Sequence, residues 1–194
     1  MVHTLAAFFY RIASWKLLLL TIPFYLAFPG YFFKTLETRM NAYAGQTIGP
    51  IDLLMGNFDP DKILEMVAAY GPEGRPYYAF GELTADLAYP IIYTFLLCVS
   101  LSLLFRQKPY TPFYWVNVLP VAIMLSDFLE NSLIVTLLNT YPDTSRSVAI
   151  LCMVFTNLKW TVFFLVVGLI LYGLARLLLS RLSRANPSKR TEQI

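Results

Sequence analysis

The chain has 194 residues, of which 57% are hydrophobic and 14% are charged. A soluble domain usually carries about 25% charged residues, so this composition excludes an ordinary soluble protein and indicates a membrane protein. The net charge of +3 is too small for a nucleic-acid-binding protein, and the basic residues form no stripe on a soluble surface. Membrane lipids are therefore the expected partners, and nucleic acid is not.

Metal and cofactor chemistry built on histidine or cysteine is nearly excluded. The single histidine, His3, lies in the N-terminal tail, and Cys98 and Cys152 lie in separate apolar runs without CxxC spacing. We expect no cofactor and no metal. The pair Asp127-x-x-Glu130 resembles carboxylate metal ligands on a helix, but no second such motif accompanies it, so this indication is weak.

Four apolar runs are long enough to cross a bilayer, which takes about 20 helical residues. The expected fold is all-α: a polytopic membrane protein whose four transmembrane helices form a left-handed bundle. Residues 1–184 form the single domain, and residues 185–194 form a disordered cytoplasmic tail. The expected spans cover about residues 17–33, 83–105, 113–138 and 148–175.

Basic residues set the expected orientation through the positive-inside rule. They flank the cytoplasmic ends of the spans at Arg11, Lys16, Arg106, Lys108, Arg176, Arg181, Arg184, Lys189 and Arg190. The opposite side carries fewer, spread over a much longer loop. Both termini should therefore be cytoplasmic, and a bacterial inner membrane is the expected location.

The outer loop, residues 34–82, is long enough to contain a helix. Asp59 fits an N-cap and Pro60 a first helical position, after which apolar residues share one face up to Tyr70. Gly71-Pro72 should end this helix of about residues 61–70. It is expected on the outer bilayer surface or over the mouth of the bundle, as a packing element or as a lid.

Charged and amide side chains lie inside the spans, where each charge costs about 2.5–3.5 kcal/mol at mid-helix. Asp127, Glu130 and Asn131 are spaced i, i+3 and i+4, so they share one helical face. That face should point into the bundle. Span four carries Asn157 and Lys159 at a similar depth.

The hairpin between spans three and four predicts which of these groups meet. Its turn centres near Asp143, and Asp127 and Lys159 are each sixteen residues from that centre. At ~1.5 Å per residue they are level, close to the middle of a ~30 Å core. We expect an Asp127–Lys159 ion pair, with Glu130 and Asn157 beside it and Glu130 level with Thr156.

The predicted cluster has one carboxylate more than it has ammonium groups. Either a carboxyl is protonated, or a cation or a ligand amine supplies the balance. Asp86 and the following Tyr89 lie nearer the outer surface and are expected at the entrance. The competing interpretation is that these polar groups only hold the helices together.

The sequence resembles two groups of membrane proteins. The motifs Asp86-Leu87-Ala88-Tyr89-Pro90, Leu119-Pro120, Asp127-x-x-Glu130-Asn131 and Lys159-Trp160 look like those of uncharacterised bacterial four-span proteins. The layout is also similar to the sterol-isomerase and sigma-2-receptor group: four spans, a long first outer loop, and acids in a membrane cavity. That resemblance implies no isomerase chemistry, because the isomerases depend on histidine and the predicted spans of this chain contain none.

Three classes of function stay open. The leading hypothesis is an outer-leaflet-facing pocket for a small amphipathic or cationic molecule, with or without acid–base chemistry on it. In that hypothesis Asp127 or Glu130 is the acid or base, Lys159 keeps its neighbour ionised, and Asp86, Tyr89, Asn131 and Asn157 bind the ligand. The alternatives are an accessory subunit, paired with partner membrane subunits or with a second copy of itself, and ion translocation.

Overall fold

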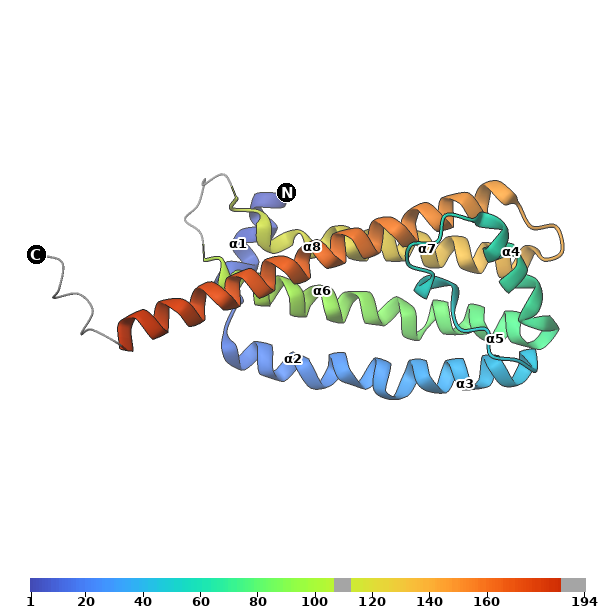
Figure 1. Ribbon diagram of the computed structural model, residues 1–194, viewed down its shortest axis with the longest axis horizontal. Coiled ribbons are helices and arrows are strands. Elements are labelled where there is room, and N and C mark those ends of the chain that lie inside the picture. Colours follow the sequence, from blue (N-terminus) through green and yellow to red (C-terminus); the bar gives the residue numbers. More distant parts are fainter. Residues whose placement is uncertain (107–112, 186–194) are drawn as a thin grey trace, which may run out of the picture.

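The computed structural model describes residues 1–106 and 113–185, and this part of the chain is built from helices and their connections (Figure 1). The helical elements, in chain order, are α1 (Val2–Ile12), α2 (Trp15–Ala27), the π-helical turn η1 (Phe28–Phe32), α3 (Phe33–Ala44), the 3₁₀ turn η2 (Ile51–Leu53), α4 (Pro60–Ala69), α5 (Gly71–Leu83), α6 (Ala85–Leu104), the 3₁₀ turn η3 (Val116–Val118), α7 (Pro120–Thr140) and α8 (Arg146–Ala185).

Four helical segments of the described chain are long and apolar enough to cross a bilayer. They are Trp15–Ala44, Gly71–Leu104, Val116–Thr140 and Arg146–Leu182. Each contains most or all of one expected span, so the all-helical class and the four apolar helices predicted from sequence are confirmed. These four helices indicate a membrane-integral protein.

The first two long helical segments extend beyond the expected spans, so the first loop is shorter than predicted. α3 continues the first long segment to Ala44, and α5 starts at Gly71. The predicted loop of residues 34–82 was therefore too long, because both of its ends are helical. The connection that remains, residues 45–70, contains η2 and α4.

α4 begins where the sequence predicted. The Asp59 side chain accepts a hydrogen bond from the backbone N–H of Asp61 at 3.0 Å, and Pro60 occupies the first turn. The apolar face of α4 is buried against α8 and α5, with Ile63 and Val67 almost fully covered. α4 is therefore a packing element of the bundle. Gly71, at φ +74°, allows the chain to turn directly into α5.

The N-terminal helix α1 was not predicted, because residues 1–14 contain no run long enough to span a bilayer. Its buried residues, Ala6, Phe9 and Tyr10, pack against α6 and η3. The Tyr10 hydroxyl donates to the Phe105 carbonyl at 3.1 Å, and the Asn117 amide donates to the Ala6 carbonyl at 3.0 Å. Two buried hydrogen bonds thus fix α1 to the end of the bundle opposite the α7–α8 turn (Figure 1).

Two further points concern the ends of the long helices. Pro120 lies inside the predicted span of residues 113–138, but it is the first residue of α7 and is tolerated there without loss of a hydrogen bond. The predicted tail, residues 185–194, lies outside the described residues except for Ala185, which ends α8.

Two glycines of α8 give a matched test of helix packing. A Cβ atom at Gly173 would lie 2.9 Å from the Leu104 Cβ and 3.1 Å from a ring atom of Phe105, whereas a Cβ at Gly168 would meet nothing within 4 Å. Alanine favours a helix over glycine by up to ~1 kcal/mol at either position. Gly173→Ala also forces α8 away from α6, so we expect it to be less stable than Gly168→Ala by about 1–3 kcal/mol. Thermal unfolding of the two variants in detergent measures this difference, and equal stabilities would contradict the close packing of α8 on α6.

Candidate functional site

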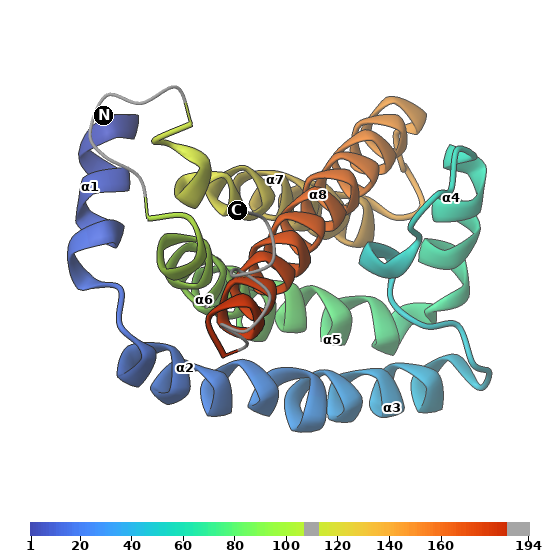
Figure 2. The same ribbon diagram turned by 60° about the vertical axis from the view of Figure 1, so that its left-hand side comes forward.

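A cavity of about 790 Å³ lies inside the bundle. Side chains from all four long segments and from residues 50–53 of the first loop line it. Figure 2 shows the course of these segments, with α2 and α3 along one side of the molecule and α8 crossing it. This volume is within the usual range of about 300–1,000 Å³ for small-molecule sites. The wall is mostly apolar, with polar groups gathered near the first loop and α7.

The polar groups on α7 and α8 form the ion cluster that the hairpin geometry predicted. Lys159 Nζ lies 3.1 Å from Asp127 Oδ1 and 2.5 Å from Glu130 Oε2, so its ammonium forms an ion pair with each carboxylate. The Thr156 hydroxyl donates to Glu130 Oε1 at 2.6 Å. The predicted Asp127–Lys159 pair and the level of Glu130 with Thr156 are confirmed.

The cluster members differ in their access to the cavity. Asp127 and Lys159 line the cavity, whereas Glu130 is fully buried and is not among the lining residues. The second oxygen of Asp127 accepts a hydrogen bond from the Tyr93 hydroxyl at 2.8 Å. Both oxygens of Asp127 therefore have partners, and this carboxylate is held in place by three neighbouring helices, α6, α7 and α8.

Of the four residues expected to bind a ligand, Asp86 and Tyr89 line the cavity, and Asn131 and Asn157 are absent from its lining. The Asn131 amide donates to the Asp86 carbonyl at 3.0 Å, so it positions the first turn of α6. Asn157 faces the first loop, where it accepts from the Gly56 N–H at 3.0 Å and donates to the Asn57 carbonyl at 2.8 Å. The sequence analysis predicted Asn157 beside the ion pair. This prediction is wrong, because the Asn157 side chain contacts the first loop instead.

The first loop brings a further carboxylate, Asp52, to the cavity. The Trp160 indole N–H donates to the Asp52 carbonyl at 3.0 Å. The Tyr78 hydroxyl accepts from the Ile51 N–H at 2.9 Å and donates to Asp52 Oδ1 at 3.2 Å. Burial raises the pKa of the Asp52 carboxyl, the Lys159 ammonium lowers it, and the charge of Asp127 raises it further.

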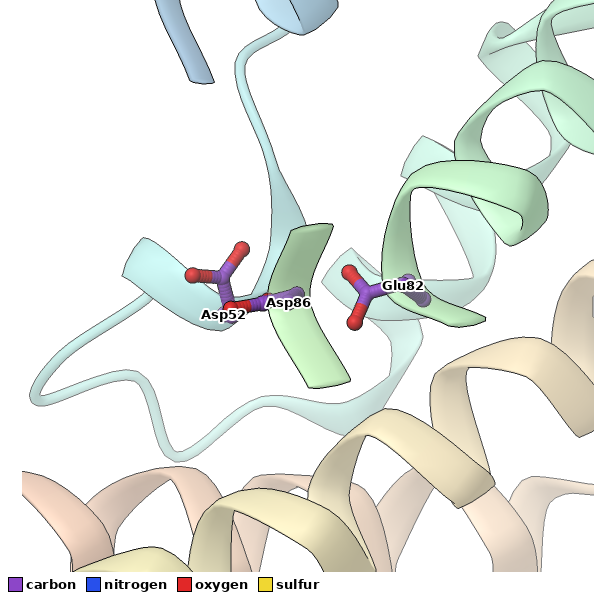
Figure 3. A group of neighbouring side chains, drawn as sticks. All are labelled: Asp52, Glu82 and Asp86. Atoms are coloured by element: carbon purple, nitrogen blue, oxygen red, sulfur yellow. The ribbon is translucent and has the colours of Figure 1, made fainter. Parts of the chain in front are cut away.

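Asp52 meets Glu82 and Asp86 in a group that we call the carboxylate triad (Figure 3). One oxygen from each of the three lies within 4.8 Å of the other two. Glu82 and Asp86 are 2% and 8% exposed. Glu82 and Asp86 are four residues apart in the sequence, but no spacing rule indicated that Asp52, thirty residues before Glu82, would join them.

The carboxyl groups around the cavity greatly outnumber the ammonium groups. Five carboxyls, the triad together with Asp127 and Glu130, share the ammonium of Lys159, while Lys34 and Glu37 at the wall offset each other. An unpaired buried carboxylate is costly, so four of these groups need either a proton or a cation that the described chain does not supply.

Aromatic rings form the apolar part of the wall. Tyr89 is at their centre: its ring stacks on Tyr25 at 5.6 Å and meets Tyr93 and Phe33 edge-on at 5.2 and 5.1 Å between centroids. Trp160 continues this wall on α8. Aromatic faces beside carboxylates favour an organic cation, because the ring quadrupole attracts positive charge.

No known protein family, no curated protein and no solved structure matches this chain at a significant level.

Proposed function

We propose that the protein is an integral membrane protein, located in a bacterial inner membrane with both termini cytoplasmic. The distribution of basic residues along the chain supports this orientation. It places the α7–α8 turn, the first loop and the carboxylate triad toward the outer side of the membrane, and α1 toward the cytoplasm. The cavity then lies at the depth of the outer leaflet.

We propose that this cavity binds a small amphipathic cation taken from the outer leaflet. The observation that carries the proposal is a cavity of about 790 Å³ with carboxylates in excess of ammonium groups at one end and aromatic rings along its wall. The charged head of the ligand would meet Asp86 and the aromatic rings of Tyr89 and Tyr93, and its apolar part would extend along α2 and α8.

The geometry favours binding over acid–base chemistry at the ion cluster. Asp127 has a partner on each oxygen, and Glu130 lies behind Lys159 without lining the cavity. A general base needs free access to the proton that it abstracts. In this proposal Asp127 and Lys159 are a fixed polar part of the cavity wall, and the ion pair with Glu130 keeps Lys159 charged.

A series of amphiphiles with one chain length tests the proposal. The purified protein in nonionic detergent is titrated with dodecyltrimethylammonium, dodecyl sulfate and dodecanol, with the fluorescence of Trp160 as the readout, because this indole lines the cavity. We expect saturable binding of the ammonium compound, at least about tenfold tighter than that of the other two. Asp86→Asn should reduce this preference, and Asp143→Asn, on the α7–α8 turn, serves as the matched control.

Two results would contradict the proposal. One is equal response to all three amphiphiles, which would indicate detergent-like partitioning. The other is a Trp160→Phe variant that keeps the whole fluorescence change, since the signal would then come from Trp15 or Trp115 outside the cavity.

The second candidate function, an accessory subunit, is favoured by the surface of the first segment. No residue of α2 is buried, and large apolar side chains such as Leu19, Leu20 and Phe24 are more than half exposed. In a bilayer this face meets either acyl chains or a partner helix. Native mass spectrometry of the protein extracted from its own membrane would reveal a stoichiometric partner chain or a second copy, which the binding proposal does not require.

A further inference from the structure

The carboxylate triad lies at the loop end of the cavity, where three separate elements converge. Asp52 comes from η2, Glu82 from the last turn of α5 and Asp86 from the first turn of α6. Figure 3 shows the three side chains close together where these elements meet, with the Glu82 carboxyl facing Asp86 and Asp52. Oxygen ligands from carboxylates are what hard divalent cations bind.

A second observation at the same place is an orphaned buried oxygen. Glu82 is 2% exposed, and its Oε2 atom has no hydrogen-bond partner within residues 1–106 and 113–185. In Figure 3 the Glu82 carboxyl points toward Asp86 and Asp52. Leaving such an atom without a partner costs about 1–3 kcal/mol, and more when the group is charged. The other two members of the triad are acids as well, so they offer the Glu82 carboxyl no opposite charge.

Lys159 does not resolve this imbalance. Its ammonium is committed to Asp127 and Glu130, which already exceed it in charge, and no salt bridge from Lys159 to a triad member is present among the described residues. The triad therefore needs either protons or a cation of its own.

We propose that Asp52, Glu82 and Asp86 bind one divalent cation, for which Ca²⁺ has the best size. Ca²⁺ binds oxygens at about 2.3–2.6 Å, so two of its ligands lie at most about 4.6–5.2 Å apart. The triad oxygens all lie within 4.8 Å of one another, so they fit within the span of a Ca²⁺ shell. Mg²⁺, at about 2.0–2.1 Å, needs its ligands within about 4.2 Å. No metal was expected from the sequence, because it has no histidine or cysteine site and no second carboxylate motif beside Asp127-x-x-Glu130.

The bound cation joins the first loop to the membrane helices. Asp52 is already oriented by the Tyr78 hydroxyl and the Trp160 indole, so little reorganisation is needed when the ion enters. The cation would fix η2 to the α5–α6 junction and so hold the loop over the cavity. This site shares Asp86 with the amphiphile site of the proposed function, so the two proposals are tested in separate titrations.

Metal titrations of the full-length protein in nonionic detergent test the proposal. After treatment with EDTA and its removal, the protein is titrated at pH 8 with CaCl₂, MgCl₂ or MnCl₂ at constant ionic strength, by calorimetry and by thermal unfolding. We expect one Ca²⁺ per chain, a melting temperature that rises with Ca²⁺ concentration, and weaker binding of Mg²⁺. Slower amide exchange of residues 50–57 with Ca²⁺ is expected as well.

Matched variants locate the site. Glu82→Gln and Asp86→Asn should each weaken Ca²⁺ binding by about tenfold or more, because each removes a charged ligand. Glu65→Gln, on the exposed face of α4, should leave binding unchanged, and Asp127→Asn should change it by less than either triad variant. Asp52→Asn tests the third ligand. Because Asp52 lies in the loop, this variant still tests the site if Glu82→Gln or Asp86→Asn fails to fold.

Absence of saturable Ca²⁺ binding to the wild type would overturn the proposal, as would Ca²⁺ binding that Glu82→Gln and Asp52→Asn leave intact. The outcome is independent of the amphiphile titrations, because these are run in EDTA and the metal titrations contain no dodecyltrimethylammonium. Either proposal can therefore fail alone.

Discussion

Lys159→Met is expected to lower the free energy of unfolding by about 3–5 kcal/mol, the usual result of removing one partner from a buried ion pair. Lys159 is the ammonium that contacts both Asp127 and Glu130, and its side chain is 9% exposed. Without it two carboxyl groups would stay in an apolar layer with no opposite charge. Thermal unfolding in detergent, followed by circular dichroism, measures the loss.

Two companion variants separate lost charge compensation from lost packing. Asp127→Asn leaves Lys159 paired with Glu130 alone, so its cost should be clearly smaller than that of Lys159→Met. The triple variant Lys159→Met, Asp127→Asn, Glu130→Gln has no charge in this layer and should recover most of the stability. If Lys159→Met were as stable as the wild type, these three groups could not form the buried cluster described above.

Asn157→Leu is expected to release the first loop from α8. The Asn157 side chain makes hydrogen bonds with the backbone of Gly56 and Asn57, and these bonds span about a hundred residues of sequence. These bonds are exposed or part-buried, and a typical hydrogen bond contributes about 0.5–1.5 kcal/mol to stability. Local opening of residues 50–58 should therefore become more frequent by about tenfold or more, and amide hydrogen exchange, read by mass spectrometry, should be faster there.

The control for this variant is Asn139→Leu, an exposed position near the end of α7. It has the same change of side chain and should leave exchange in the loop unaltered. Exchange in α6, α7 and the middle of α8 should also be unaltered in Asn157→Leu. Unchanged exchange of residues 50–58 would mean that Asn157 does not anchor the loop.

Sequence patterns predicted those parts of the site that depend on one helix or on one hairpin. The spacing of Asp127, Glu130 and Asn131 is a property of the α-helix itself, and all three are buried as predicted. The depth of Lys159 relative to Asp127 followed from a short turn and a constant rise per residue. These inferences needed no knowledge of how the other helices pack.

The same reasoning was wrong where rotation about a helix axis mattered. Asn157 and Lys159 are two residues apart, so they point about 200° apart around α8, and one cannot accompany the other into the cluster. Asn157 contacts the loop, while Lys159 contacts Asp127. The sequence interpretation compared depths alone and overlooked this angle.

The sequence by itself determined that the chain is helical, that four segments are apolar enough to cross a bilayer, and that Asp127 and Lys159 lie level in adjacent helices, because helical period and apolar length are local properties. Only the tertiary structure decided that α1 packs on the bundle, that a cavity stays open beside α2, and that Asp52 joins Glu82 and Asp86. The path of residues 45–59 has no repeating period. The position of this segment in the folded protein is set by hydrogen bonds with the side chains of Tyr78, Asn157 and Trp160, which are distant in sequence.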